Sequence, residues 1–283
     1  MSKKKVASKS DENEYGKWEG IPEELLALAV IRIPADEMMR VVPLVCKSWW
    51  AVVAGPLCWE NIDLRQWSCR KTNSDQVDVA VRKLVRHSRS SFHHLSAFKL
   101  GNSGFAFAAN RARCLKVLNM SESNVTDQMV IRHAESLANL TDLDISYCIK
   151  ISWKGLEAFG KQCKFLVNLK RNMPPPNLGI SIQEANLKID ESEAMVIANT
   201  MSKLQHLEIW FGCFSNLGLN YVLTKCKALE YLDIRGCWSV GWEEDLETKC
   251  EKIAGFKSPW VDDVYETEDS DVYETEDSEI LTE

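Results

Sequence analysis

A leucine-led pattern recurs through the chain and constrains its fold more than any other feature of the sequence. The leading leucines of five clear copies are 25, 26, 38 and 25 residues apart, and a weaker copy begins 20 residues earlier. Steps of this size are typical of one strand-and-helix repeat, and stacked repeats form a solenoid. From the weak one onward, the copies are LSAFKLGNS at 95, LKVLNMSES at 115, LTDLDISYC at 140, LVNLKRNMP at 166, LQHLEIWFGC at 204 and LEYLDIRGC at 229.

Each copy predicts a short strand followed by a helix. In L-x-x-L-x-L the second and third apolar residues are two apart, so both point to one face of a strand. An amphipathic segment follows, such as TDQMVIRHAESLANL at 126. One such unit cannot cover its own apolar faces, but stacked units can. The units resemble leucine-rich repeats of the cysteine-containing type. This resemblance implies an α/β solenoid with parallel strands on its concave face and helices on its convex face.

The cysteines follow the same repeat. No two form a C-x-x-C pair, and no histidine lies at zinc-ligand spacing beside a pair. We therefore expect reduced, buried thiols with a structural role, and no metal site. The spaced pairs are Cys148 and Cys163, fifteen residues apart, and Cys213 with Cys226 and Cys237 with Cys250, each thirteen apart.

The acidic residues are concentrated at one end of the chain. Of the 41 Asp and Glu residues, eleven lie in 261–283, which contains no Lys or Arg. Without them, 34 basic residues face 30 acidic ones, and a net charge of about +4 does not favour nucleic-acid binding. Residues 259–283 also contain the octapeptide DVYETEDS twice in tandem, and we expect them to be a disordered tail.

The first residues, 1–17, are predicted to be a disordered basic segment. No apolar run follows them as in a secretory signal, and none elsewhere is long enough to span a membrane. We therefore expect a protein of the nucleus, the cytoplasm or both, with no membrane partner.

Residues 65–258 are assigned to the repeats. A first, imperfect repeat combines WENIDL at 59–64 with a helix whose apolar face carries Val77, Val81, Leu84 and Val85. The 38-residue step contains three consecutive prolines, which favour extended chain and cannot donate backbone hydrogen bonds. About residues 172–192 are therefore predicted to be an insertion, either a binding loop or a tolerated surface excursion.

Residues 18–64 read as a separate small domain. Pro22 and Pro34 suit helix starts, and three short helices are predicted at about 22–31, 35–42 and 43–54. A domain of this size has a small core. The segment contains more apolar residues than such a core can bury.

This segment resembles the F-box, because the elements of the F-box pattern occur in it in the same order. The matches are Ile21-Pro22, Leu25, Leu26, Ile31, Ile33-Pro34, Val45-Cys46-Lys47-Ser48-Trp49, Pro56-Leu57 and Trp59. Together with the repeats, the resemblance covers about 230 of the 283 residues. The arrangement of a short F-box and cysteine-containing repeats resembles that of plant proteins.

The resemblance implies binding to the Skp-type adaptor of a cullin-RING ubiquitin ligase. It places Leu26 and Ile31 in the domain's own core and leaves Trp50 open to either role. The residues expected to contact the adaptor are Ile21, Pro22, Leu25, Ile33, Pro34, Val45, Cys46 and Trp49.

A protein substrate is expected on the concave face of the repeats. Residues between the strand leucines point there, and Trp, Tyr and Arg are the types enriched in binding hot spots. The expected substrate-binding residues are His206, Glu208, Trp210, Tyr231, Asp233 and Arg235.

The sequence favours a non-catalytic receptor over an enzyme. It contains no nucleophile elbow, phosphate-binding loop, metalloprotease motif or dinucleotide fingerprint, so we expect no catalytic residues and no cofactor. The resemblance implies a substrate receptor that leads a target to ubiquitination and proteasomal degradation. An alternative is a repeat scaffold outside ubiquitin chemistry, which would bind RNA or a nuclear-transport partner through the basic helix near 82–89.

Overall fold

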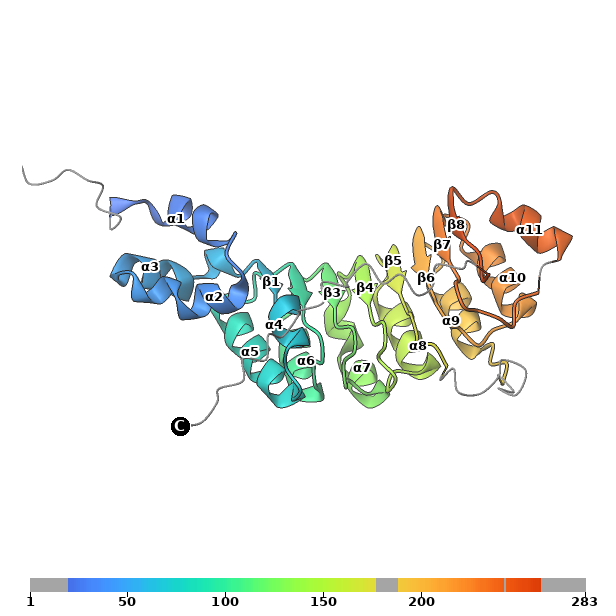
Figure 1. Ribbon diagram of the computed structural model, residues 1–283, viewed down its shortest axis with the longest axis horizontal. Coiled ribbons are helices and arrows are strands. Elements are labelled where there is room, and N and C mark those ends of the chain that lie inside the picture. Colours follow the sequence, from blue (N-terminus) through green and yellow to red (C-terminus); the bar gives the residue numbers. More distant parts are fainter. Residues whose placement is uncertain (1–19, 177–187, 242, 261–283) are drawn as a thin grey trace, which may run out of the picture.

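The computed structural model describes residues 20–176, 188–241 and 243–260, which form a parallel sheet backed by helices and a small helical domain (Figure 1). The sheet has eight strands, whose order in space is their order along the chain. Each repeat therefore adds one strand beside the last. The strands are β1 (Asn61–Asp63), β2 (His94–Ser96), β3 (Val117–Asn119), β4 (Asp142–Asp144), β5 (Asn168–Lys170), β6 (His206–Glu208), β7 (Tyr231–Asp233) and β8 (Gly255–Lys257).

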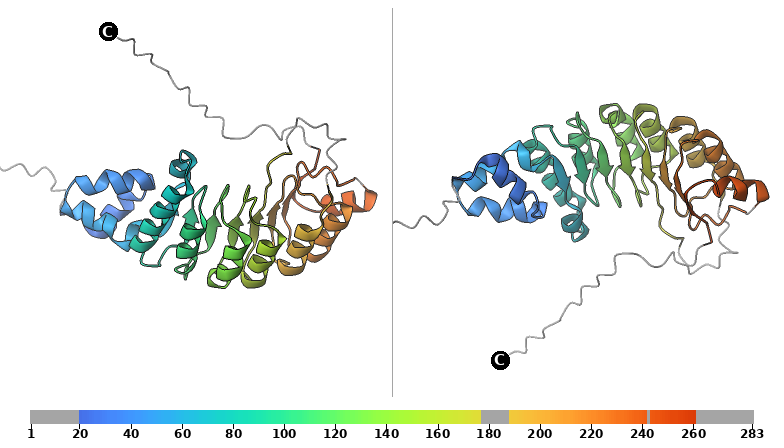
Figure 2. Two further views of the ribbon diagram at one scale, coloured as in Figure 1. Left: turned by 90° about the horizontal axis from the view of Figure 1, so that it is seen from below. Right: turned by 90° about the horizontal axis from the view of Figure 1, so that it is seen from above.

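The molecule is an arc with its strands on the inner side and its helices on the outer side (Figure 2). This arrangement confirms the predicted α/β solenoid. The helices of the repeats are α4 (Arg65–Cys69), α5 (Ser74–His87), α6 (Asn102–Ala109), α7 (Asp127–His133) with η4 (Ala134–Leu137), α8 (Trp153–Gln162), α9 (Ser192–Thr200), α10 (Asn216–Lys225) and α11 (Glu244–Cys250).

The middle residue of each strand points into the core between sheet and helices. Because strands alternate their side chains, the residues on either side of it face the concave surface. The middle residues pair across the whole sheet, and all but Phe256 are fully buried. They are Ile62, Leu95, Leu118, Leu143, Leu169, Leu207, Leu232 and Phe256.

The sequence pattern misplaces the weak copy by three residues. Leu95 pairs with Leu118, the second leucine of the next copy, so Leu95 is not a leading residue. The buried Phe92 fills the leading place, and Ala97 fills the third apolar place. The repeat therefore begins at Phe92 and not at Leu95. The last strand, β8, is not among the predicted copies, although Ile253 and Phe256 have the spacing of the first two leucines.

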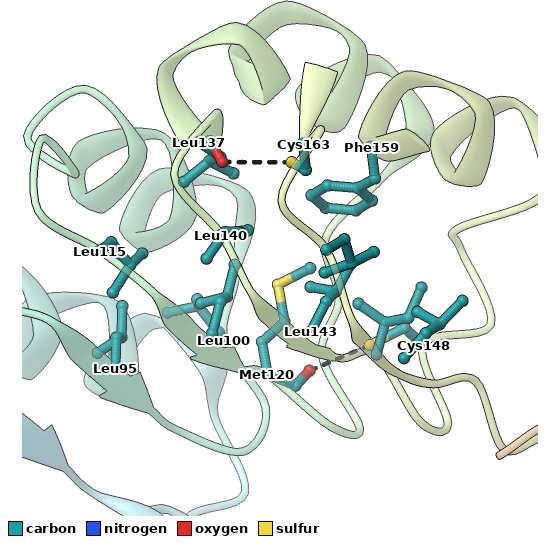
Figure 3. Close-up of a cluster of buried hydrophobic side chains, with 14 of the residues drawn as sticks. Leu95, Leu100, Leu115, Met120, Leu137, Leu140, Leu143, Cys148, Phe159 and Cys163 are labelled. Carbon is teal, nitrogen blue, oxygen red and sulfur yellow. Dashed lines mark hydrogen bonds between the residues drawn. The ribbon is translucent and has the colours of Figure 1, made fainter. Parts of the chain in front are cut away.

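Cysteine thiols join successive repeats (Figure 3). Cys148 donates from the turn after β4 to the carbonyl oxygen of Met120, 3.1 Å away, and Cys237 makes the same bond to Ile209. At the helix ends, Cys163 donates to Leu137 across 3.2 Å. The ten cysteines, all within the described residues, are free thiols.

Cys213 departs from the predicted burial of the spaced cysteines, because its side chain is exposed. Cys213 lies nine positions after its leading Leu204, whereas Cys148 lies eight after Leu140. Cys213 therefore comes one position too late to occupy the place that Cys148 takes in its turn. Phe214, at 3% exposure, enters the core beside it instead.

A buried arginine marks the irregular repeat. Arg171 occupies the third apolar place of its copy, where the other clear copies carry Met or Ile, yet it is only 2% exposed. Its guanidinium donates to the carbonyl oxygens of Cys148 and Ile151 and pairs with Glu193 at 2.8 Å. Glu193 belongs to α9, beyond the insertion. Arg171 therefore ties the chain on both sides of the insertion together.

The N-terminal domain is built from short helices around a compact core. They are α1 (Glu23–Val30), α2 (Ala35–Arg40), η2 (Val42–Leu44), α3 (Lys47–Ala54) and η3 (Pro56–Cys58). Pro22 and Pro34 stand directly before α1 and α2, as predicted. The predicted helix at 43–54 is instead interrupted at Cys46, whose extended backbone precedes α3.

Trp59 packs this domain against the first repeat. Its ring is fully buried, and its indole nitrogen donates to the carbonyl oxygen of Val53 across 2.7 Å. His87, at the end of α5, lies 6.2 Å from it between ring centroids and contacts the carbonyl oxygen of Ala54. These contacts therefore hold the helical domain against one end of the arc.

Three sequence predictions fall wholly or partly outside the described residues. They concern the basic segment 1–17, the acidic tail 259–283, of which only 259 and 260 are described, and the insertion at 172–192, of which 177–187 are not described.

Candidate protein-binding sites

The helical domain exposes an unusual number of large apolar side chains. Leu44 is 81% exposed, and Leu25 and Leu28 on α1 are each 59% exposed. Such a concentration on one small domain is typical of a protein-binding surface. We call these residues the apolar patch: Leu25, Leu28, Ile31, Val41, Leu44, Val45, Trp50 and Leu57.

The residues expected to contact an adaptor divide into two groups. Pro22, Leu25, Pro34 and Val45 are exposed. The others are half-buried, and of these Ile21, Ile33 and Trp49 pack against the domain's own core. Cys46 completes the second group. The exposed group can meet a partner without any change in the fold.

One expected core position is wrong. Leu26 is buried at 2%, as predicted, but Ile31 is 48% exposed. Leu26 and Val30 are four residues apart on α1 and share its inward face, whereas Ile31 follows the end of the helix. Trp50, left open by the sequence, is exposed at 57%.

Four further apolar side chains are exposed without having been predicted so: Leu28, Val41, Leu44 and Leu57. Helical spacing gives a signal for three of them. Leu28 lies three residues after Leu25, and Val41 lies three before Leu44, so each pair shares a helical face. An alignment to the F-box pattern alone does not show which leucines face outward.

On the concave surface, the strand register places side chains in rows. His206 and Tyr231 are cross-strand neighbours in one row, and Glu208 and Asp233 in another. The residues that follow two positions later, Trp210 and Arg235, continue the same face. The structure therefore brings all six expected substrate-binding residues together on β6, β7 and the turns after them.

Glu208 is the centre of a hydrogen-bonded network on this surface. Its Oε1 lies 2.9 Å from Lys170 Nζ and 2.7 Å from His206 Nε2, and its Oε2 accepts from Asn172. Burial alone would raise the pKa of Glu208. The hydrogen bonds from Lys170 and His206 outweigh it and hold that pKa below its ordinary value. Glu208 is therefore ionised at neutral pH. Its partners Lys170 and Asn172 are not among the predicted site residues.

A second network surrounds Asp233. Arg235 places Nε and Nη2 on the Asp233 carboxylate at 3.1 and 2.8 Å, and these bonds raise the pKa of Arg235. The guanidinium carbon lies 4.3 Å from the centroid of the Trp210 ring, in cation–π contact. Beside this pair, His206 and Tyr231 stack with ring centroids 4.3 Å apart. The result is a preorganised surface of rings and charges, suited to binding a protein.

Among the described residues, no group of three or more His, Cys, Asp or Glu side chains is arranged to hold a metal ion. Burial raises the pKa of the Cys148 and Cys163 thiols to about 12 and that of Cys226 to about 11. Such thiols stay protonated at neutral pH and are poor nucleophiles.

The basic helix considered for nucleic acid is partly used by the fold. On α5, Arg82 donates to the carbonyl oxygen of Asp78, and Arg86 lies 5.2 Å from the centroid of Phe107. Within the described ranges, no helix is long and apolar enough to cross a membrane.

The sequence has clear relatives among known proteins, although no protein-family model matches it. F-box protein FBW2 of Arabidopsis thaliana is 40% identical over 228 residues, which cover 80% of this chain and 70% of that protein. F-box protein SKIP1 is 30% identical over 270 residues, 90% of each chain. Putative F-box/LRR-repeat protein 23 is 29% identical over 245 residues, 86% of this chain and 53% of that one. Both come from Arabidopsis thaliana.

Proposed function

We propose a function for this chain, which belongs to the F-box proteins with leucine-rich repeats. It is the substrate-recognition subunit of an SCF ubiquitin ligase. The F-box binds the Skp-type adaptor, and through it the cullin-RING ligase, while the repeats bind a protein substrate. The complex acts in the nucleus, the cytoplasm or both, and its substrate is ubiquitinated and degraded by the proteasome.

The mechanism is proximity, with no covalent step on this chain. One surface fixes the receptor to the ligase, and the other holds a substrate lysine near the ubiquitin-charged enzyme, which raises the effective concentration of the two reactants. The packing contact at Trp59 supports the proximity mechanism. Because the buried Trp59 ring packs the F-box against the first repeat, the distance between the two surfaces is set by the fold.

The observation that carries the proposal is the pair of surfaces at opposite ends of one arc. The apolar patch lies on the F-box, and the Glu208 and Asp233 networks lie on β6 and β7. Figure 1 shows the helices of the F-box and these two strands toward opposite ends of the molecule. An apolar patch that no element of its own domain covers fits a permanent partner. A polar and aromatic surface fits an exchangeable one.

The adaptor contact is tested most cleanly at exposed residues, because Trp49 also packs against the core. Leu44→Glu with Val45→Glu places two charges in the patch. We expect affinity for purified Skp-type adaptor to fall by at least about tenfold, since hot-spot contacts contribute about 2 kcal/mol or more each. Ile131→Glu with Leu217→Glu is the matched control, because these side chains are 57% and 59% exposed on the helices.

Adaptor binding is measured by interferometry, and circular dichroism checks that each variant is folded. The expected result is loss of binding for the F-box pair and parent-like binding for the helix pair. Parent-like binding by both pairs contradicts the proposed adaptor contact.

The substrate surface is tested by affinity purification and mass spectrometry of the full chain. With Trp210→Ala and Tyr231→Ala we expect captured substrate to be lost and the adaptor retained. With Leu44→Glu and Val45→Glu we expect the reverse. Phe165→Ala, at a ring 58% exposed away from this surface, is the control. A substrate that is captured equally by all variants shows that the concave residues do not bind it.

A further inference from the structure

The concave surface from β5 to β8 presents cations to solvent and buries its acids. Lys170, Glu208, Asp233 and Lys257 are cross-strand neighbours in one row. The two acids in the middle are 8% and 0% exposed. The Lys170 side chain is 45% exposed, and Lys257 is also exposed.

Arg235 adds to the cationic character of this surface. Its side chain is 20% exposed above Asp233, whose side chain is only 1% exposed. A partner therefore meets Lys170, Arg235 and Lys257 together with the rings of Trp210 and Tyr231. On the far side of Lys170, β4 carries Asp142 and Asp144, so the cationic surface ends there.

The described chain ends beside this surface. After β8, the carbonyl oxygen of Pro259 accepts a hydrogen bond from the amide of Gly236, the residue next to Arg235. Trp260 follows and is 56% exposed. The residues that come next, 261–283, carry eleven acids and no Lys or Arg.

The geometry points to these acidic residues as an intramolecular ligand: we infer that residues 261–283 bind the cationic surface formed by Lys170, Arg235 and Lys257. Opposite charge favours the contact at short range. Reach permits it, because β5 and β8 are separated by three strand spacings, roughly 15 Å, which about five extended residues span. Attachment at Trp260 makes the local concentration of acids high, on the order of millimolar for a short flexible tether.

The contact has a consequence that rests on the proposed function. If the same surface binds substrate, residues 261–283 compete with it, and only a substrate that displaces them is captured. The docking itself does not depend on ubiquitin chemistry, so it is tested without adaptor or substrate.

The test uses the full chain and a fluorescent peptide of residues 261–283, followed by anisotropy at low salt. A variant with all eleven tail acids changed to Asn or Gln has lost its own competing segment. We expect it to bind the peptide about tenfold more tightly than the parent, and we expect about 0.5 M salt to remove most of that binding.

Two variants locate the contact in the background with the neutral tail. Lys170→Gln with Lys257→Gln removes two cations from the proposed surface, and we expect peptide affinity to fall by roughly fivefold or more. Arg113→Gln with Lys116→Gln removes two exposed cations from a hollow beside the N-terminal ends of β2, β3 and β4. His93 and Phe165 also line this hollow. We expect this control to bind as its background does.

Two results would overturn the inference. One is equal peptide binding by the parent and the neutral-tail chain. The other is a larger loss from the Arg113 and Lys116 pair than from the Lys170 and Lys257 pair. Neither result involves the adaptor, so failure here is distinct from failure of the F-box contact.

Discussion

The first and seventh strands carry the same ion pair in different surroundings. In both, an Asp at the end of the strand accepts the guanidinium of an Arg two residues later, at 2.7 Å for Asp63 and Arg65 and 2.8 Å for Asp233 and Arg235. In each pair the Asp also accepts the backbone amide of its Arg. The exposed fractions of Arg and Asp are 50% and 45% on β1, but 20% and 1% on β7.

The difference comes from the neighbouring strands. β1 lies at the end of the sheet, whereas β7 lies between β6 and β8. The turn after β6 supplies Trp210, whose ring covers the Arg235 guanidinium. The same Asp-x-Arg pattern therefore gives a solvated turn at one end and a buried, ring-covered site at the other. A third arginine, Arg171, extends the comparison to almost complete burial.

The largest effect is expected at Arg171. Arg171→Ala leaves Glu193 and two carbonyl oxygens without their donor inside the solenoid, so we expect a loss of about 4 kcal/mol of unfolding free energy. Lys161→Ala is the control, because its pair with Glu157 is exposed on α8 and an exposed helical pair contributes about 0.3 to 0.5 kcal/mol. Urea unfolding measures both. Similar losses would contradict the link between burial and energy.

The paired aspartates test the comparison directly. Asp233→Ala removes the counter-charge of a mostly buried arginine, and we expect a loss of about 3 kcal/mol. Asp63→Ala acts on an exposed, screened pair, so we expect less than about 1 kcal/mol. Denaturant titration of the two variants at one pH provides the measurement. A loss at Asp63 as large as that at Asp233 would show that neighbouring strands do not set the strength of the pair.

The contribution of the ring over Arg235 is smaller. In a double-mutant cycle of Trp210→Ala and Arg235→Ala, we expect a coupling of about 1 kcal/mol from the cation–π contact. The stabilities of the parent, both single variants and the double variant give this value. Additive losses would mean that Trp210 covers Arg235 without attracting it.

The smallest effect concerns pH. Burial alone would raise the pKa values of Asp63 and Glu208, but hydrogen bonds from Arg65 and from Lys170 lower both below 3.8 and 4.5, respectively. A lowered folded pKa contributes stability above the unfolded pKa, and that stability is lost as pH falls through the folded value. We expect carboxyl NMR titrations to place both midpoints below these ordinary values. Midpoints above them would contradict the networks.

Much of the solenoid follows from the sequence because its period is local. Leu118, Leu143, Leu207 and Leu232 are found by spacing alone, and each is the buried centre of a strand. Departures occur where another residue fills a repeated place. Phe92 replaces a leading leucine, Arg171 replaces an inward aliphatic residue, and Cys213 lies one position after the place of the buried turn cysteines.

The sequence predicts only some of the residues in each candidate site. The concave residues on β6 and β7 follow from strand alternation, but their partners Lys170 and Asn172 come from β5 and the turn after it, 38 and 36 residues before Glu208. On the F-box, the family pattern identifies Leu25 and Val45 and misses Leu44, the most exposed large apolar side chain of the described residues. Which F-box residues contact the adaptor stays a prediction.

The sequence by itself determined the repeat length, the parallel strands and the F-box resemblance, since each depends on spacing along the chain. Tertiary structure alone decided that Asp233 is buried while Asp63 is solvated, and that Ile31 faces outward while Val30 faces inward. The physical reason is that burial depends on which strands and helices lie alongside a residue. Those neighbours belong to the repeats before and after the residue or to another helix of its domain, and a local pattern contains no record of them.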